Sequence, residues 1–402
     1  MSAHLNDLRV SVAAQGRRRV FTLATAAFVA LATAATGNVL AGPREQAKRI
    51  HDRIAGVPPS AAVLTQMEAD IVAGQPLSAA NRALQSSAFY NVTLKNFAAP
   101  WTNREQSVFV PLNDYTATVI GMVRDDEPFN TVLSGDIIYT GQGASGVAAF
   151  SPASNDHYEQ LESRGADLRT VLVKQQQSAL TGLPAAATAG VLTTRAASQA
   201  FFIAGTNRAM FRFTLMNHMC RDLEQTMDTT RPPDRIRQDV SRSPGGDARV
   251  FLNNCVGCHS GMDPLAQAFA HYHYDETQGR LFYTAAQVQP KYFNNADNFK
   301  PGFVTKDDRW DNYWRGGNNQ LLGWDAGLAG SGTGAKSMGQ ELANSDAFAQ
   351  CQVEKVFKAV CFRAPGNATD RSRIQSIKAT FKSSNYSLKR VFAETAVYCM
   401  GD

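Results

Sequence analysis

Apolar residues recur at helical spacing near both ends of this 402-residue chain. Near the amino end the pattern predicts a helix within 60–73, for which Ser60 is a suitable N-cap. Near the carboxyl end it predicts helices over 346–361 and 388–398, and between them a helix whose cap is Asp370. The apolar positions of these faces are Val63, Leu64, Met67, Ile71, Phe348, Val353, Phe357, Val360, Ile374, Ile377 and Phe381. The pattern therefore predicts a mainly α, multi-helix protein.

The remaining segments divide into further helices and long irregular loops. Residues 43–55, 77–89 and 112–124 are also predicted to be helical, and a stripe of Phe and Met residues predicts a helix over 201–226. Residues 276–335 have little periodicity, which is typical of functional or flexible loops. That loop region contains many glycines together with Trp310, Trp314 and Trp324.

The first 41 residues have the pattern of an export signal. Arg17, Arg18 and Arg19 precede Val20–Thr36, a segment that is apolar and free of charge. Small residues follow, and we predict cleavage after Ala41. The apolar run is short for a membrane-spanning helix, which needs roughly 20 residues, so we expect no stable membrane anchor.

The string Cys255-Val256-Gly257-Cys258-His259 has the spacing at which haem c is attached. Two thiols at this spacing can both form thioethers to the same porphyrin, and the histidine that follows can bind the iron as its proximal ligand. A structural zinc site is the weaker interpretation, because zinc needs four ligands and the chain has no second C-x-x-C pair. We therefore predict one covalently bound haem c, held by Cys255, Cys258 and His259, followed by a short helix over 265–274.

The predicted export signal and the predicted haem-attachment motif support each other, because haem c is attached outside the cytoplasm. We expect the periplasm, or the secreted or cell-surface fraction, of a bacterium. In that compartment the other four cysteines are expected to pair. Cys351 and Cys361 lie ten residues apart on one predicted helix, about 15 Å of rise, which is too far for a disulfide. The pairings left open are Cys220–Cys351 with Cys361–Cys399, or Cys220–Cys361 with Cys351–Cys399.

These features suggest a division of the chain into four parts. Residues 1–41 are the signal peptide, and residues 42–140 form an N-terminal helical region. Residues 141–240 form a middle region of helices and loops, and residues 241–402 form the haem c-binding C-terminal domain, which we expect to be cytochrome c-like. The formal net charge of +5 includes the basic signal, so the mature chain is closer to neutral. No basic run with interleaved aromatic residues occurs, so nucleic acid is not an expected partner.

Several segments together resemble the planctomycete-type cytochrome c family, large secreted haem proteins whose domains have no assigned function. CVGCHSGMDPLAQAF, from residue 255, is similar to the family's CxxCHxxMDPLGxAxE segment. Residues 345–363 resemble its C-terminal SxxFAxCLVxKLFxYALGR helix, and residues 53–59 and 126–133 resemble its RLTGLPPT and RPFDELL segments. The resemblance implies a largely helical secreted haem protein and supplies no substrate. His271-Tyr272-His273-Tyr274 departs from the family pattern at the end of the haem segment.

The sixth ligand of the iron is left open by the sequence. Met338 lies well downstream, where a distal methionine often occurs in small c-type cytochromes, and His273 lies close after the motif. These two are the leading candidates, each with packing as the alternative role, and an empty or water-bound position is the other interpretation. Weaker candidates are Met216, His218, Met219 and His271, whereas Met262 is expected on the proximal side.

The ligand at the sixth position of the iron distinguishes the possible functional classes of the protein. Two strong axial ligands are typical of electron transfer, and an open position is typical of peroxidase- or oxygenase-like chemistry. We predict a monohaem c-type cytochrome whose partner is another redox protein that donates or accepts electrons. One haem in so long a chain also leaves open a helical binding or scaffold module with an accessory haem.

Overall fold

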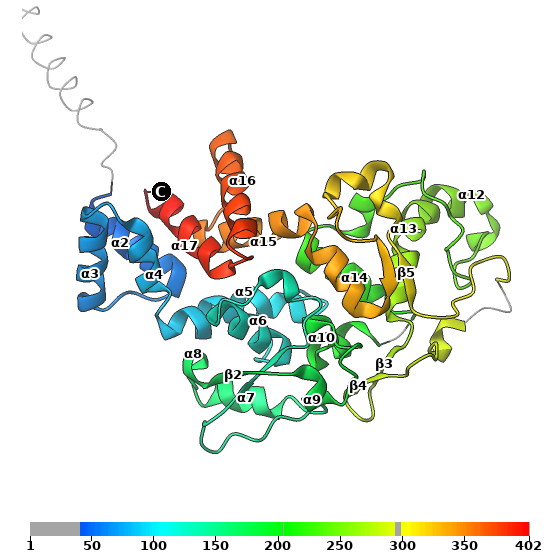
Figure 1. Cartoon of the computed structure of the whole chain (residues 1–402), viewed down its shortest axis with the longest axis horizontal. Coiled ribbons are helices and arrows are strands. Elements are labelled where there is room, and N and C mark those ends of the chain that lie inside the picture. The colour runs from blue at the N-terminus through cyan, green and yellow to red at the C-terminus, as the bar shows by residue number, and fades with distance from the viewer. Residues whose placement is uncertain (1–40, 204, 294–298, 402) are drawn as a thin grey trace, which may run out of the picture. The chain divides into compact units, whose positions relative to one another are not determined.

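The computed structural model describes residues 41–203, 205–293 and 299–401. The predicted signal segment lies outside these residues, apart from Ala41. The described residues from Pro43 to Met400 belong to one compact unit, which is mainly helical (Figure 1). No helix among the described residues combines the length and the apolar composition needed to cross a membrane.

The α-helices in the amino-terminal half are short. They are α2 (Pro43–Ala55), α3 (Ala61–Val72), α4 (Pro76–Ala83), α5 (Lys95–Ala98), α6 (Asp114–Arg124), α7 (Asp156–Ser163), α8 (Leu168–Val171), α9 (Gln177–Thr181) and α10 (Arg195–Phe201). The side chain of Ser60 accepts a hydrogen bond from the backbone amide of Val63, so the predicted cap of α3 is confirmed.

The second half contains the longest helices. They are α11 (Arg208–Thr214), α12 (Ala248–Val250), α13 (Val256–Ala266), α14 (Gly334–Ala343), α15 (Asp346–Cys361), α16 (Ala368–Ser383) and α17 (Leu388–Tyr398). The ranges predicted for α15 and α17 are confirmed, with Ser345 and Ser387 as their caps. The cap of α16 is Asn367, whose side chain accepts from the amide of Asp370, so the prediction that Asp370 is the cap was wrong.

Strands occur only as three short antiparallel pairs in the described part of the chain. The pairs are β1 (Ile138–Gly141) with β2 (Leu172–Gln175), β3 (Tyr272–Asp275) with β4 (Arg280–Tyr283), and β5 (Arg309–Asp311) with β6 (Ser331–Thr333). Strands β4, β5 and β6 lie within the segment predicted to be irregular, and β3 lies just before it. Each strand is only three or four residues long, too short for an alternating pattern to stand out in the sequence.

Two predicted helices differ from the structure. The helix predicted over 201–226 is broken, because α10 ends at Phe201 and α11 passes into a π-helical turn, η5 (Leu215–Met219). Cys220 then adopts a left-handed conformation with φ of 52°, which ends the segment. The helix predicted over 265–274 instead begins at Val256 and ends soon after Pro264, and residues 272–275 are strand β3.

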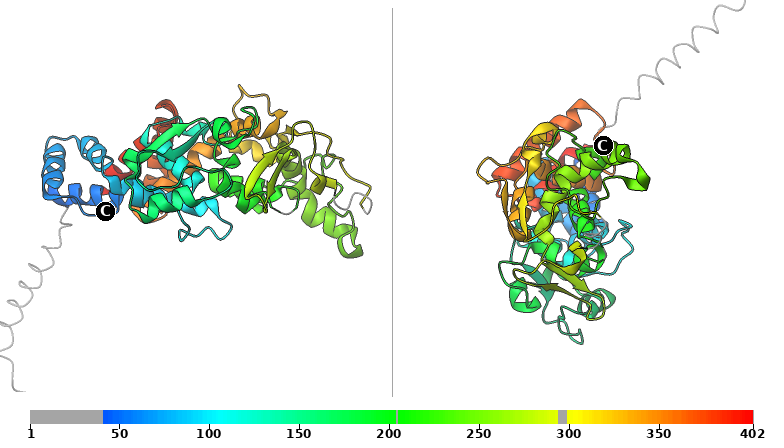
Figure 2. Two further views of the ribbon diagram at one scale, coloured as in Figure 1. Left: turned by 90° about the horizontal axis from the view of Figure 1, so that it is seen from below. Right: turned by 90° about the vertical axis from the view of Figure 1, so that its right-hand side faces the viewer.

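One hydrophobic core joins distant parts of the chain. It contains Ile50 of α2, Leu161 of α7, Leu265 of α13 and Phe392 of α17, each almost fully buried. The helices α2 and α4 pack against α17, so the two ends of the described chain lie side by side (Figures 1 and 2). All three predicted regions of the mature chain therefore contribute to one core.

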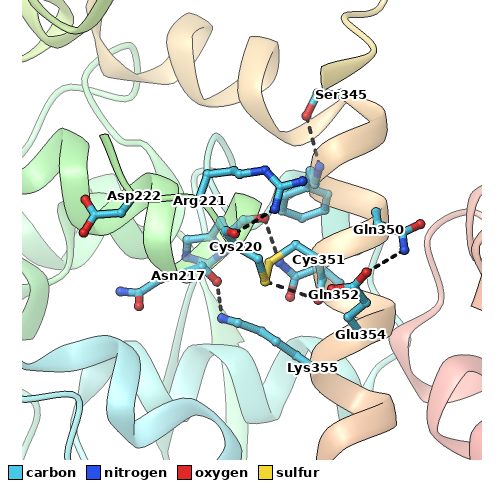
Figure 3. Close-up of a disulfide and its surroundings, with 12 residues drawn as sticks. Asn217, Cys220, Arg221, Asp222, Ser345, Gln350, Cys351, Gln352, Glu354 and Lys355 are labelled. Atoms are coloured by element: carbon cyan, nitrogen blue, oxygen red, sulfur yellow. Dashed lines mark hydrogen bonds between the residues drawn. A yellow bond between two sulfur atoms is a disulfide. The ribbon is translucent and has the colours of Figure 1, made fainter. Parts of the chain in front are cut away.

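Two disulfides connect the helices. Cys220 pairs with Cys351 across 131 residues, and Cys361 pairs with Cys399 across 38 residues. Their Cα atoms are 5.3 and 5.6 Å apart, within the usual range for a disulfide. Figure 3 shows the first bridge joining the end of η5 to α15, where Lys355 also donates to the backbone carbonyl of Asn217. This connectivity is the first of the two left open by the sequence, and such bridges are typical of proteins that fold outside the cytoplasm.

Candidate functional site

The predicted haem-attachment motif lies on one continuous helical segment. A π-helical turn, η8 (Phe251–Cys255), leads directly into α13, and such turns are frequent at functional sites. Both Cys255 and Cys258 are free thiols and are partly exposed, whereas the other four cysteines form disulfides. The two motif thiols are therefore the ones left available for other chemistry.

The surroundings of Cys258 do not favour a reactive thiolate. Its sulfur lies 3.6 Å from the backbone carbonyl of Leu223. Burial, followed by the negative charge of Glu224, raises the pKa of the Cys258 thiol above its ordinary value. Redox-active C-x-x-C sites instead depend on a lowered thiol pKa, so this environment suits attachment of a group better than disulfide exchange.

Two glycines allow close packing against the motif helix. A Cβ atom at Gly257 would overlap the side chain of Met227, and one at Gly261 would overlap the indole of Trp314. Trp314 is fully buried and comes from η11 (Tyr313–Arg315), within the Trp-rich segment. That segment is therefore packed on α13 rather than free in solution.

The same segment also connects α13 to α14, the helix that carries Met338. The indole of Trp310 donates a 2.8 Å hydrogen bond to the hydroxyl of Ser337. Arg315 donates two 2.8 Å bonds to the buried carboxylate of Glu341. These contacts fix β5 and η11 between the two helices.

His259 is paired with a buried carboxylate one turn further along α13. Its Nδ1 lies 3.1 Å from Oδ1 of Asp263, and the His259 side chain is 21% exposed. An ionised carboxylate only accepts hydrogen bonds, so the proton of a neutral His259 lies on Nδ1. Nε2 is then unprotonated, and no hydrogen bond from a described residue reaches it. His259 therefore presents a free ring nitrogen for metal binding.

Asp263 is held in the ionised form by neighbouring donors. Arg208 donates to both of its oxygens, at 2.7 and 2.9 Å, and the backbone amide of Arg237 donates to Oδ2 at 3.2 Å. Burial alone would raise the pKa of Asp263, but the charges of Arg208 and Arg237 and the bonds from His259 and Arg208 hold it well below its ordinary value. Arg208 also binds both oxygens of Asp239, at 2.5 and 2.8 Å. The result is a chain of contacts from Asp239 through Arg208 and the fully buried Asp263 to His259, in which the other three residues are partly exposed.

The two leading candidates for the sixth ligand are placed apart from this pair. Met338 lies on α14, fully buried in the main hydrophobic core. His273 lies on β3, partly exposed, with its ring stacked on Phe282 at a centroid distance of 6.4 Å. These positions do not show which side chain would face an iron bound at His259, so the identity of the sixth ligand stays a prediction.

The weaker candidates have packing contacts of their own. His218 is fully buried, and its Nε2 lies 2.6 Å from the hydroxyl of Tyr115. The Nδ1 of His271 lies 3.3 Å from Oδ2 of Asp308. Met219 and Met262 are buried in the main core, and Met216 is partly buried beside it. Each of these side chains therefore has a packing or polar neighbour, although Nε2 of the buried His271 has no hydrogen-bond partner among the described residues.

The motif residues fit the covalent haem that the sequence predicts. Two unpaired thiols lie on one helix, and the adjacent histidine has one ring nitrogen fixed and the other free. Cys255 also packs against a small apolar cluster of Ile236, Val240, Phe251 and Val256, which is separate from the main core. Within the described residues no group of three or more His, Cys, Asp or Glu side chains is arranged to hold a metal ion.

Two cavities lie away from the motif. One of about 460 Å³ is lined by polar residues that include Arg104, Glu159 and Arg195, and one of about 550 Å³ lies between α4 and α16. Neither is lined by Cys255, Cys258 or His259.

Comparison with known proteins gives no relative for this chain, because no family model, curated protein or solved structure matches it significantly. The family resemblance of the motif segments therefore stays a prediction.

The sequence interpretation overlooked Asp263, Arg208 and Asp239 as site residues. The spacing of His259 and Asp263, four residues apart, places them on the same face of a helix. That signal was present, but the predicted helix began after the motif. Arg208 and Asp239 come from distant segments, and no local pattern connects them to His259.

Proposed function

We propose that this chain is an exported monohaem c-type cytochrome that transfers electrons to or from another redox protein. The observation that carries the proposal is the selective pairing of the cysteines. Four cysteines form disulfides, and only the two at C-x-x-C spacing before His259 stay free. In a compartment that favours disulfides, such a pair is expected to be consumed by another covalent partner.

Each motif residue has a defined part in this proposal. Cys255 and Cys258 provide the sulfurs for two thioethers, and His259 provides Nε2 as the proximal ligand. Asp263 keeps the proton of His259 on Nδ1, which fixes the tautomer and the orientation of the ring. The bound haem would supply a one-electron change between ferrous and ferric iron. Trp314 and Met227 pack against the motif helix and hold it in place.

A second candidate function is a haem enzyme with an open sixth position. The packing of the two leading ligand candidates favours it, because Met338 is fully buried in the main core and the ring of His273 stacks on Phe282, so each side chain has a role that needs no iron. Binding of carbon monoxide to the reduced protein separates the two functions. A slow or absent spectral change is expected of an electron carrier with two strong ligands, and a prompt change would favour the enzyme.

The test of haem attachment uses the full chain produced in a bacterial host that attaches haem c outside its cytoplasm. The exported protein is expected to stay coloured after denaturation and to give the pyridine haemochrome spectrum of a haem with two thioethers. Cys255→Ala/Cys258→Ala is expected to abolish covalent haem. The matched control, Cys361→Ala/Cys399→Ala, removes two cysteines of a disulfide and is expected to retain it. A wild-type protein that is exported and folded without haem would contradict the proposal.

A further inference from the structure

The contact between His259 and Asp263 bears on the properties of the iron as well as on its attachment. The two residues lie one helical turn apart on α13, and the carboxylate is completely buried. A carboxylate that accepts the Nδ1 proton of a metal-bound imidazole makes the ring a stronger donor to the metal. A stronger donor stabilises ferric iron more than ferrous iron, because the ferric ion carries the greater charge.

The carboxylate has little freedom to move away. Its Oδ1 accepts from His259 and from Nε of Arg208, and its Oδ2 accepts from a second Arg208 nitrogen and from the amide of Arg237. Arg208 is in turn fixed by Asp239. Because every partner is itself held, the direction of the hydrogen bond to His259 is built into the fold.

We propose that Asp263 is a positioning residue that acts through His259 to lower the reduction potential of the haem. This inference rests on the proposed function, because it requires haem iron on Nε2 of His259. It extends that function by assigning the oxidised state as the one that the protein favours, which suits an electron donor to a partner of higher reduction potential.

The test compares two isosteric substitutions that each remove one negative charge. Asp263→Asn removes the carboxylate that accepts from His259. Asp239→Asn removes a carboxylate from the same cluster but leaves the contact between His259 and Asp263 in place. Potentiometric titration of each haem-loaded protein measures the ratio of reduced to oxidised iron. We expect Asp263→Asn to raise this ratio by on the order of tenfold at a fixed ambient potential. That change equals a shift of about 59 mV for one electron.

The outcomes separate the two proposals. A clearly smaller shift in Asp239→Asn supports the role of the hydrogen bond. Equal shifts in the two variants would mean that charge alone matters and would overturn it, as would an unchanged potential in Asp263→Asn. If wild-type protein carries no covalent haem, the proposed function itself fails, and the spectrum shows this before any potential is measured.

A measurement on unaltered protein covers the case in which Asp263→Asn does not fold. In ¹⁵N-labelled reduced protein, with carbon monoxide added if the iron is paramagnetic, the Nδ1 proton of the iron-bound histidine can be observed. We expect it to be deshielded beyond the range of imidazoles bonded to neutral carbonyls. A signal within that neutral-acceptor range would overturn the inference.

Discussion

At the scale of single residues, position 261 has no room for a side chain, because a methyl group there would overlap the indole of Trp314. Trp314 is fully buried and has no room to withdraw. Although alanine favours a helix intrinsically, we expect Gly261→Ala to lower the free energy of unfolding by about 1–3 kcal/mol through overpacking. Urea denaturation followed by circular dichroism measures this change.

The control for that substitution is Gly366→Ala, because the nearest atom to an added Cβ there is the Asp370 carboxylate oxygen at 3.9 Å. Its stability is expected to change by no more than about 0.5 kcal/mol. A Gly261→Ala protein as stable as wild type would contradict the close packing of Trp314 on α13.

The burial of Lys291 predicts that the free energy of unfolding rises at alkaline pH. Its ammonium group donates to the backbone carbonyl of Phe202, at 2.8 Å, and to Asn207, and burial lowers its pKa to about 8. The unfolded lysine keeps its proton up to about pH 10.4. Between these values the unfolded state binds more protons, so the free energy of unfolding rises with pH. We expect an increase of up to about 2 kcal/mol between pH 8 and 10, since each unit contributes about 1.4 kcal/mol.

Denaturation curves of Lys291→Met across that range are expected to lack this increase. The control, Lys300→Met, removes an exposed lysine nearby and is expected to keep it. If wild type and Lys291→Met had the same alkaline slope, the assigned role of burial at Lys291 would be wrong.

The sequence predicts the attachment residues but not the residues that support them. Cys255, Cys258 and His259 are recognisable because the chemistry of haem attachment requires them to be adjacent in the chain. Asp263, four residues after His259, was not recognised as a supporting residue. The reason is that Gly257, Gly261 and Pro264 have low helical propensity, so the sequence does not predict a helix through the motif. Packing against Met227 and Trp314 overrides that propensity, and such tertiary contacts are not visible in a single sequence.

At the scale of elements, the two disulfides predict different losses of stability. The bridge from η5 to α15 closes 131 residues, and the bridge from α15 to the end of α17 closes 38. On the chain-entropy model these loops correspond to about 5 and about 4 kcal/mol. We expect Cys220→Ala/Cys351→Ala to lower the free energy of unfolding by about 1 kcal/mol more than Cys361→Ala/Cys399→Ala. The two double variants serve as controls for each other in guanidinium denaturation, and the reverse order would contradict the entropic account.

Helices with a strong local signal were predicted well. α3, α15 and α17 each combine an apolar face with a serine cap, and their predicted positions are confirmed. The helix predicted over 201–226 was wrong because its Phe and Met residues belong to separate elements, α10, α11 and η5, and the disulfide and left-handed turn at Cys220 end the segment. The choice between the two disulfide patterns also depended on which helices meet in space, which helical spacing alone does not determine.

At the scale of the whole molecule, the core does not follow the order of the chain. α17 packs on α2 and α4, and the helix α14 contacts the segment after Pro128, so carboxyl-terminal elements complete the core begun by amino-terminal ones. The first and last predicted regions of the mature chain are therefore joined by packing, and the middle region contributes Leu161 and Phe211 to the same core. A core of this kind is expected to unfold cooperatively, because losing one region exposes apolar surface of the others.

Tryptophans at two places in the fold can test this cooperativity. Trp101 is buried beside Phe97 in the first predicted region, residues 42–140. Trp314 belongs to the last region, residues 241–402, and is buried against α13. In a variant that retains only Trp101, and in another that retains only Trp314, we expect the fluorescence midpoint in urea to coincide with the far-UV circular dichroism midpoint of that same variant. Comparing two probes within each variant removes the effect of the substitutions on stability. Separate midpoints would instead mean that residues 42–140 and 241–402 unfold independently, and that the packing of α17 on α2 and α4 contributes too little free energy to couple them.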